Sequence, residues 1–92
     1  MDKKMIIPGT ELLGYRIVKH IGIVSGVAYG GAGLSKTDHD AVLEDANKNM
    51  GLRASSLGAN AIVSVHAQVV GEVPLKSVAF FVYGNAVVAE PV

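Results

Sequence analysis

Apolar residues follow two different periodicities along the first two thirds of this chain. Over residues 15–25 they fall on alternate positions, a spacing typical of a β-strand, with four on one parity: Tyr15, Ile17, Ile21 and Ile23. Over residues 38–57 they fall three and four positions apart, which places them on one stripe of a helix: Leu43, Ala46, Met50, Ala54 and Leu57. The spacing therefore predicts a first strand followed by one long helix.

Glycine marks the boundaries of these elements. Four glycines among residues 26–33 predict a loop between the strand and the helix. Gly58 follows the helical stripe and suits the left-handed position just beyond a helix end, so we expect the helix to stop there. Gly51 lies inside the expected helix, where it indicates either close packing or a local break.

Two further strands are expected over residues 61–70 and 77–89, and both are apolar on more than one face. In the second strand, one parity is wholly apolar and the other is mixed; the apolar parity holds Ala61, Val63, Val65, Ala67 and Val69. In the third strand, one parity holds Val78, Phe80, Val82, Ala86 and Val88, and the other holds Ala79, Phe81, Tyr83 and Val87. An antiparallel sheet with one solvated face alternates more cleanly between apolar and polar residues.

These elements predict an α+β fold, a two-layer β-α-β-β subunit with a mainly antiparallel sheet and one long helix. Residues 5–7 add a short extended segment before the turn at residues 8–10. One helix covers only one face of the sheet, so we expect a neighbouring copy of the chain to cover much of the other. No internal repeat or charge block divides the sequence, and residues 1–92 are predicted to form one domain.

The composition supports self-association. Half of the 92 residues are apolar and 17% are charged, against about a quarter charged in ordinary soluble domains. Lysine and arginine balance aspartate and glutamate at eight each, which argues against nucleic acid or an anionic membrane as a partner. No apolar run approaches the ~20 residues that span a bilayer, so we expect a cytoplasmic protein.

Three stretches of the sequence carry a family resemblance. They are Gly-Tyr-Arg-Ile-Val at residues 14–18 with Ile-Gly-Ile-Val-Ser-Gly at 21–26, Leu-Gly-Ala-Asn-Ala-Ile-Val at 57–63, and Tyr-Gly-Asn-Ala-Val at 83–87. As a set they resemble the YbjQ-like family, which is labelled a heavy-metal-binding domain family. The resemblance implies a dodecin-like β-α-β-β subunit that assembles into a ring, usually a homopentamer.

His20 and His66 are the candidate metal ligands. Cysteine is absent from the chain, and a neutral imidazole is a common ligand of divalent transition metals. The two histidines lie in the first and second expected strands, and their rings face each other if those strands are neighbours with matching parity. The alternative interpretation is that each is an edge or interface residue hydrogen-bonded to backbone.

The segment at residues 30–37 partly resembles a phosphate-binding loop. It has the order Gly-Gly-Ala-Gly-Leu-Ser-Lys-Thr between a strand and a helix, but Ser35 stands where such loops have glycine. An NTPase is therefore not expected. Backbone amides before a helix still suit a small anionic ligand, and this candidate site is formed by Gly30, Gly31, Gly33 and Lys36.

The sequence shows no catalytic apparatus, because no serine lies in a nucleophile elbow and no acid pairs with a histidine at a recognisable spacing. We expect Phe80 and Phe81 to serve in core and interface packing. The leading hypothesis is a homo-oligomeric binding or scaffold protein, not an enzyme, with its own copies as partners. Two alternatives are a module that binds a divalent transition metal through histidines and a ring that binds a small anion through the glycine loop.

Overall fold

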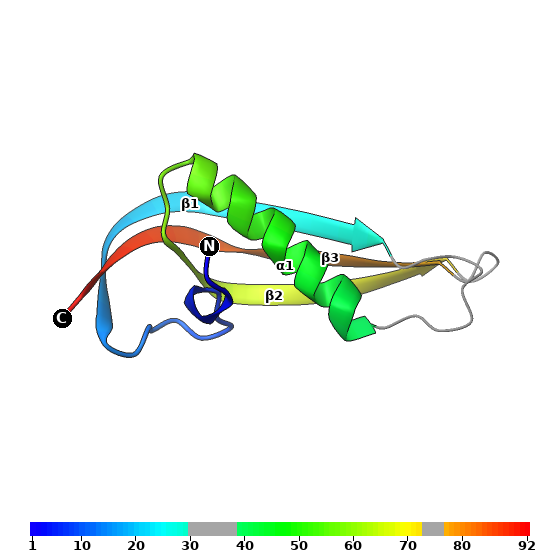
Figure 1. Ribbon diagram of the computed structural model, residues 1–92, viewed down its shortest axis with the longest axis horizontal. Helices are drawn as coiled ribbons and strands as arrows, with labels where there is room; N and C mark the ends of the chain where they lie inside the picture. The colour runs from blue at the N-terminus through cyan, green and yellow to red at the C-terminus, as the bar shows by residue number, and fades with distance from the viewer. Residues whose placement is uncertain (30–38, 73–76) are drawn as a thin grey trace.

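The computed structural model describes residues 1–29, 39–72 and 77–92, and these have the expected β-α-β-β order. A short 3-10 helix, η1 (Lys3–Met5), comes first. It is followed by β1 (Tyr15–Tyr29), α1 (His39–Ser56), β2 (Ala61–Glu72) and β3 (Ser77–Pro91). The helix lies across one face of the sheet, as Figure 1 shows. The predicted α+β architecture is confirmed.

The three described strands pair antiparallel in the order β1-β3-β2. β3 is central, because it pairs with β2 along one side and with β1 along the other. β1 and β2 are the outer strands of this sheet. Any residue of β1 is therefore separated from any residue of β2 by a full strand.

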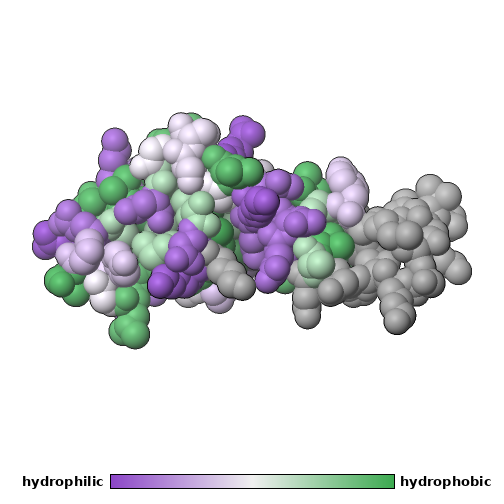
Figure 2. Space-filling model, in the orientation of Figure 1, coloured by the Kyte–Doolittle hydropathy of each residue, from purple (hydrophilic) through white to green (hydrophobic). Residues whose placement is uncertain are grey.

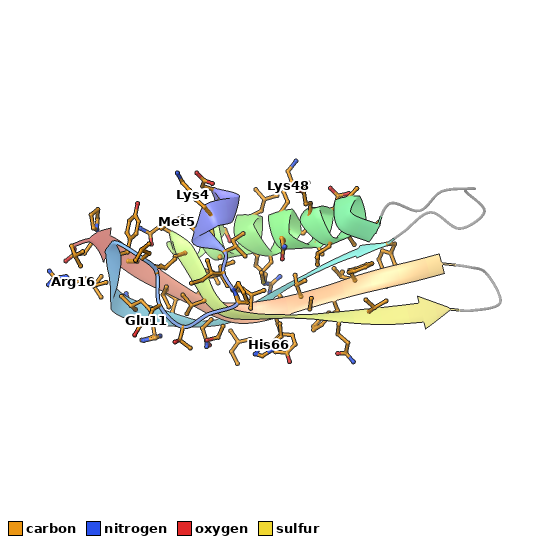
Figure 3. All side chains as sticks on the ribbon, turned by 90° about the horizontal axis from the view of Figure 1, so that it is seen from below. Lys4, Met5, Glu11, Arg16, Lys48 and His66 are labelled. Carbon is orange, nitrogen blue, oxygen red and sulfur yellow. The ribbon has the colours of Figure 1, made fainter. Side chains whose placement is uncertain are left out.

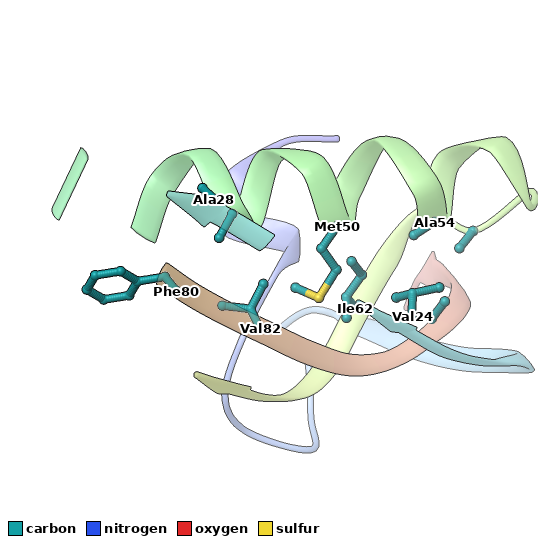
Figure 4. Packing of buried hydrophobic residues seen from close by; sticks show 10 residues of the cluster. Val24, Ala28, Met50, Ala54, Ile62, Phe80 and Val82 are labelled. Atoms are coloured by element: carbon teal, nitrogen blue, oxygen red, sulfur yellow. The ribbon is translucent and has the colours of Figure 1, made fainter. Parts of the chain in front are cut away.

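The core lies between α1 and the sheet (Figure 4). Its fully buried side chains include Met50, Ile62 and Val82, with Val24, Ala28, Ala54 and Phe80 packed around them. The helix packs directly on β1 at Gly26, where an added β-carbon would lie 2.5 Å from the Met50 backbone nitrogen and 2.9 Å from its β-carbon. The prediction of a loop beginning at residue 26 is wrong, since the strand continues through Gly26 to Tyr29 and the helix packs on it.

The alternation predicted for the first strand is wrong at Ile21. The register shifts between Ile17 and Lys19 and again between His20 and Gly22, and each β-bulge reverses which side chains face the helix. Ile21 therefore packs against the core under α1, whereas Ile17 packs on the other side of the sheet. Ile23 is 77% exposed, and Val24 is the buried residue of this stretch.

A β-bulge also reverses the faces of the second strand after Val63. Ser64 has a φ of +54°, and the register with β3 shifts between Val63 and His66. Val65 therefore packs with Ile62 beneath the helix instead of sharing a face with Val63, as the alternation had predicted. Gly84 of β3 leaves the room for this, since an added β-carbon there would lie 2.8 Å from Ile62 Cγ2 and 3.0 Å from Val65 Cγ2.

Residues 1–14, which we call the strap, cross the edge of β2 at this bulge. The Ile7 amide donates to the Ile62 carbonyl at 3.0 Å, and the Ser64 and Val65 amides donate to the carbonyls of Gly9 and Ile7 at 2.8 and 3.1 Å. The strap then places Leu12 on the side of the sheet opposite α1, against a second buried cluster formed by Ala61, Val63, Val87 and Ala89. It covers part of the sheet face that the helix leaves open.

The helix ends where the sequence predicts. The amides of Gly58 and Ala59 donate to the carbonyls of Ser55 and Ala54, both at 3.0 Å, and Gly58 has a φ of +91°, which favours glycine. Leu57 lies in this turn and is exposed, so its place in the predicted apolar stripe is wrong. Gly51 is helical and packs closely, because an added β-carbon would lie 3.3 Å from the Met1 β-carbon.

Candidate functional site

The side of the sheet opposite α1 has an uncovered apolar surface beyond the strap. We call it the open face and define it by residues that the register places side by side: Ile23, Ser25 and Val27 of β1, Phe81 and Tyr83 of β3, and His66 and Gln68 of β2. Ile23 is 77% exposed, and Val27, Phe81 and Tyr83 are each 38% exposed. The open face thus presents aliphatic and aromatic side chains to water.

The open face contains no carboxylate, ammonium or guanidinium group among its residues. The other side of the molecule differs, because hydrophilic residues gather over the middle of α1 in Figure 2. Glu44, Asp45 and Lys48 are among the exposed helix residues there. An exposed apolar patch without charges is typical of a surface that another molecule covers.

Three rings form a row across β2 and β3 on the open face. The ring centroids of His66 and Tyr83 lie 5.4 Å apart with an angle of 24° between the ring planes, and those of Phe81 and Tyr83 lie 5.9 Å apart. Figure 3 shows His66 projecting away from α1. Stacked and tilted ring pairs attract each other beyond simple area burial, so this row forms an ordered apolar surface.

The candidate metal ligands His20 and His66 are not brought together within one chain. His20 lies opposite Val87 and His66 opposite Tyr83, with β3 between them. At the usual strand spacing and rise, their backbones lie ~10 Å apart across the sheet and ~13 Å apart along it. One ion cannot bind two imidazoles at that separation. Within the described ranges, no three His, Cys, Asp or Glu side chains are grouped closely enough to hold a metal ion.

The candidate anion-binding residues Gly30, Gly31, Gly33 and Lys36 lie outside the described residues. The strand before them ends at Tyr29, and the helix after them begins at His39. The strand-then-helix order on which that hypothesis depends is therefore present. The anion site itself stays a prediction.

A groove of about 490 Å³ lies where the strap meets the start of β1. We call it the strap groove, and it is lined by Lys4, Met5, Ile7, Glu11, Leu12, Leu13 and Tyr15. Leu13 is 100% exposed, because a turn around Gly14 directs it away from the sheet that buries Leu12. That turn has a hydrogen bond of 3.1 Å from the Tyr15 amide to the Leu12 carbonyl, and Gly14 has a φ of +80°.

Part of the open face was predictable from the sequence. The parity of the third strand correctly separates Phe80, which is buried, from Phe81 and Tyr83, which lie on the open face. Strand alternation does not predict the strap groove, since the groove forms only when residues 4–13 meet the start of β1. The sole sign was the Leu-Leu-Gly sequence at residues 12–14, in which one leucine precedes a turn glycine.

No protein-family model and no curated protein matches the chain. Among solved structures, the chain is similar to the crystal structure of a protein of unknown function from Pediococcus pentosaceus ATCC 25745, which is described as belonging to the DUF74 family. The TM-score is 0.71, the sequence identity is 19%, and the match covers 92% of this chain and 96% of that chain. The likeness shows that the two proteins share a fold.

In the part of the chain that the structure describes, no helix has both the length and the apolar character needed to cross a bilayer.

Proposed function

We propose that this protein is a homo-oligomeric protein of YbjQ-like type, a binding or scaffold protein of the cytoplasm whose copies form a pentameric ring, without catalytic activity of its own. The observation that carries the proposal is the open face, an apolar and uncharged surface that α1 leaves uncovered. Burial of such surface contributes roughly 25 cal/mol per Å². A subunit of this size buries only about 60% of its unfolded surface, so cover from another copy stabilises it appreciably.

The fold supports the family type in this proposal. The similar structure belongs to DUF74, which is the YbjQ or heavy-metal-binding family. Several residues that carry the sequence resemblance have a specific place in the fold. Gly26 and Gly84 lie where an added β-carbon would be too close to its neighbours, Gly58 has a positive φ at the helix end, and Asn60 bonds to β3. The similar protein suggests no activity for this chain, because the function of that protein is unknown.

Light scattering coupled to size exclusion tests the proposal. We expect a mass several times the 9.5 kDa of the subunit at micromolar concentration. Phe81→Asp should lower this mass towards that of the subunit, because an unpaired carboxylate buried in the contact costs several kcal/mol. A parent protein that runs at 9.5 kDa would contradict the proposal.

Leu52→Asp is the matched control for this experiment. Leu52 is 58% exposed but lies on α1, away from the open face, so its substitution should leave the mass unchanged. Val87→Asp is unsuitable, because Val87 is fully buried and its loss would disturb folding.

We also propose a second candidate, a site for a divalent transition metal formed by His20 of one copy and His66 of another. Both histidines are exposed on the subunit, which a site between copies requires. The small-anion site at Gly30, Gly31, Gly33 and Lys36 is a further proposal that rests on the loop sequence alone.

A further inference from the structure

We infer that the open face of one copy binds the strap groove of another copy, so that the contact joins two different surfaces of the chain. The inference rests on the proposed homo-oligomer and identifies the surfaces that form its contact.

The strap shows that a leucine side chain packs well on the side of the sheet opposite α1. Within one chain, Leu12 packs on Ala61, Val63, Val87 and Ala89 and is 7% exposed. The next residue, Leu13, is 100% exposed. Adjacent leucines in one turn thus point in different directions, one onto the chain's own sheet and the other into solvent. Leu13 is placed to pack on an uncovered part of a second sheet.

The open face and the strap groove are also compatible in net charge and in size. The open face is uncharged, and the strap groove carries one cation and one anion, Lys4 and Glu11, so their contact buries no net charge. The groove of about 490 Å³ has room for an aliphatic or aromatic side chain. Ile23, which is 77% exposed, is the most exposed apolar residue of the open face and fits this role.

A contact between two open faces is a poorer solution. Apolar patches of this kind offer on the order of a few hundred Å² each, so a subunit that buries two patches in two contacts removes more apolar surface from water than a subunit that buries one. A subunit that uses its open face towards one copy and its strap groove towards another buries both surfaces. Pairing of open faces alone would leave Leu13 in water.

Two exposed-site variants test the inference, and each removes one surface. Ile23→Asp alters the open face and Leu13→Asp alters the strap groove. Each variant alone should lose the assembly and run at the subunit mass of 9.5 kDa. An equal mixture should form a one-to-one complex of twice that mass, because the intact groove of one variant meets the intact open face of the other. Labelling one variant with ¹⁵N distinguishes the two chains in native mass spectrometry.

Mixing Ile23→Asp with Phe81→Asp is the matched control, since both changes lie on the open face and their mixture should remain at subunit mass. Circular dichroism should show parent-like folding for Leu13→Asp and Ile23→Asp, because both side chains are exposed in the subunit. Parent-like assembly of Leu13→Asp would overturn the inference and leave the oligomer standing. Failure of the Leu13 and Ile23 variants to combine would overturn it too, whereas a monomeric parent would contradict the proposed function itself.

Discussion

Gly26 is the residue that lets the helix lie directly on β1. An added β-carbon would contact the Ala46 carbonyl oxygen and lie 2.5 Å from the Met50 nitrogen. Both are backbone atoms of α1, so neither can rotate aside as the end of a side chain would. The helix and strand would have to separate, and the close packing around Met50 would be lost.

Gly26→Ala should therefore lower the free energy of unfolding by about 1–3 kcal/mol, the usual range for an overpacked core. Urea unfolding followed by circular dichroism measures the change. Gly9→Ala is the control, because an added β-carbon there has nothing within 4 Å, and its effect should stay within ~0.5 kcal/mol. Equal losses in the two variants would show that the contact at Gly26 is not tight.

At the scale of elements, Asn60 connects the end of the helix to the central strand. Its side-chain amide accepts from the Ala89 amide and donates to the Ala89 carbonyl, both at 2.8 Å. Its backbone amide donates to the Val87 carbonyl at 3.1 Å. Asn60 thus extends the hydrogen-bond ladder of β3 just before β2 begins at Ala61.

Asn60→Ala should destabilise the protein by about 1–3 kcal/mol, because it leaves a partly buried amide and carbonyl of Ala89 without partners. Thermal unfolding measures this effect. Asn49→Ala removes a comparable side-chain hydrogen bond, from Asn49 Nδ2 to the Val27 carbonyl at 3.0 Å, but in an exposed position. Its loss should be clearly smaller, since water replaces the missing partner, and an equal or larger loss would contradict this explanation.

At the scale of the whole molecule, the two sides of the sheet are covered by different elements and to different extents. α1 covers one side, and the strap covers only part of the other. The same topology keeps His20 and His66 on opposite outer strands. A metal site that uses both histidines therefore depends on assembly, because only a second copy can bring the two rings together.

Calorimetric titration with Zn²⁺, Ni²⁺ and Cu²⁺ should accordingly give binding to the assembled parent and weaker binding to Phe81→Asp, in which the contact is lost. His20→Ala and His66→Ala should each remove the site. Acidification should weaken binding, because a protonated imidazole has no lone pair for a metal. If both histidine variants bind metal as the parent does, this site does not exist.

Much of the fold was predictable from short-range patterns. The helical stripe predicted α1 to within a residue or two, and Gly58 correctly marked its end. The parity of the third strand correctly assigned Phe80 to the core and Phe81 to the other side. Helix periodicity, helix termination and strand alternation act over a few residues, which is why they are visible in the sequence alone.

The strand order, the bulges and the strap groove were decided only by the tertiary structure. The order β1-β3-β2 separated His20 from His66, and bulges moved Ile21 and Val65 under the helix. Each of these features depends on residues far apart in the chain: Gly84 leaves room for Val65, and the strap binds the amides exposed at Ser64. Apolar spacing records which residues prefer burial, but the face on which a residue is buried depends on the strand it pairs with, and that partner is chosen when the whole chain packs.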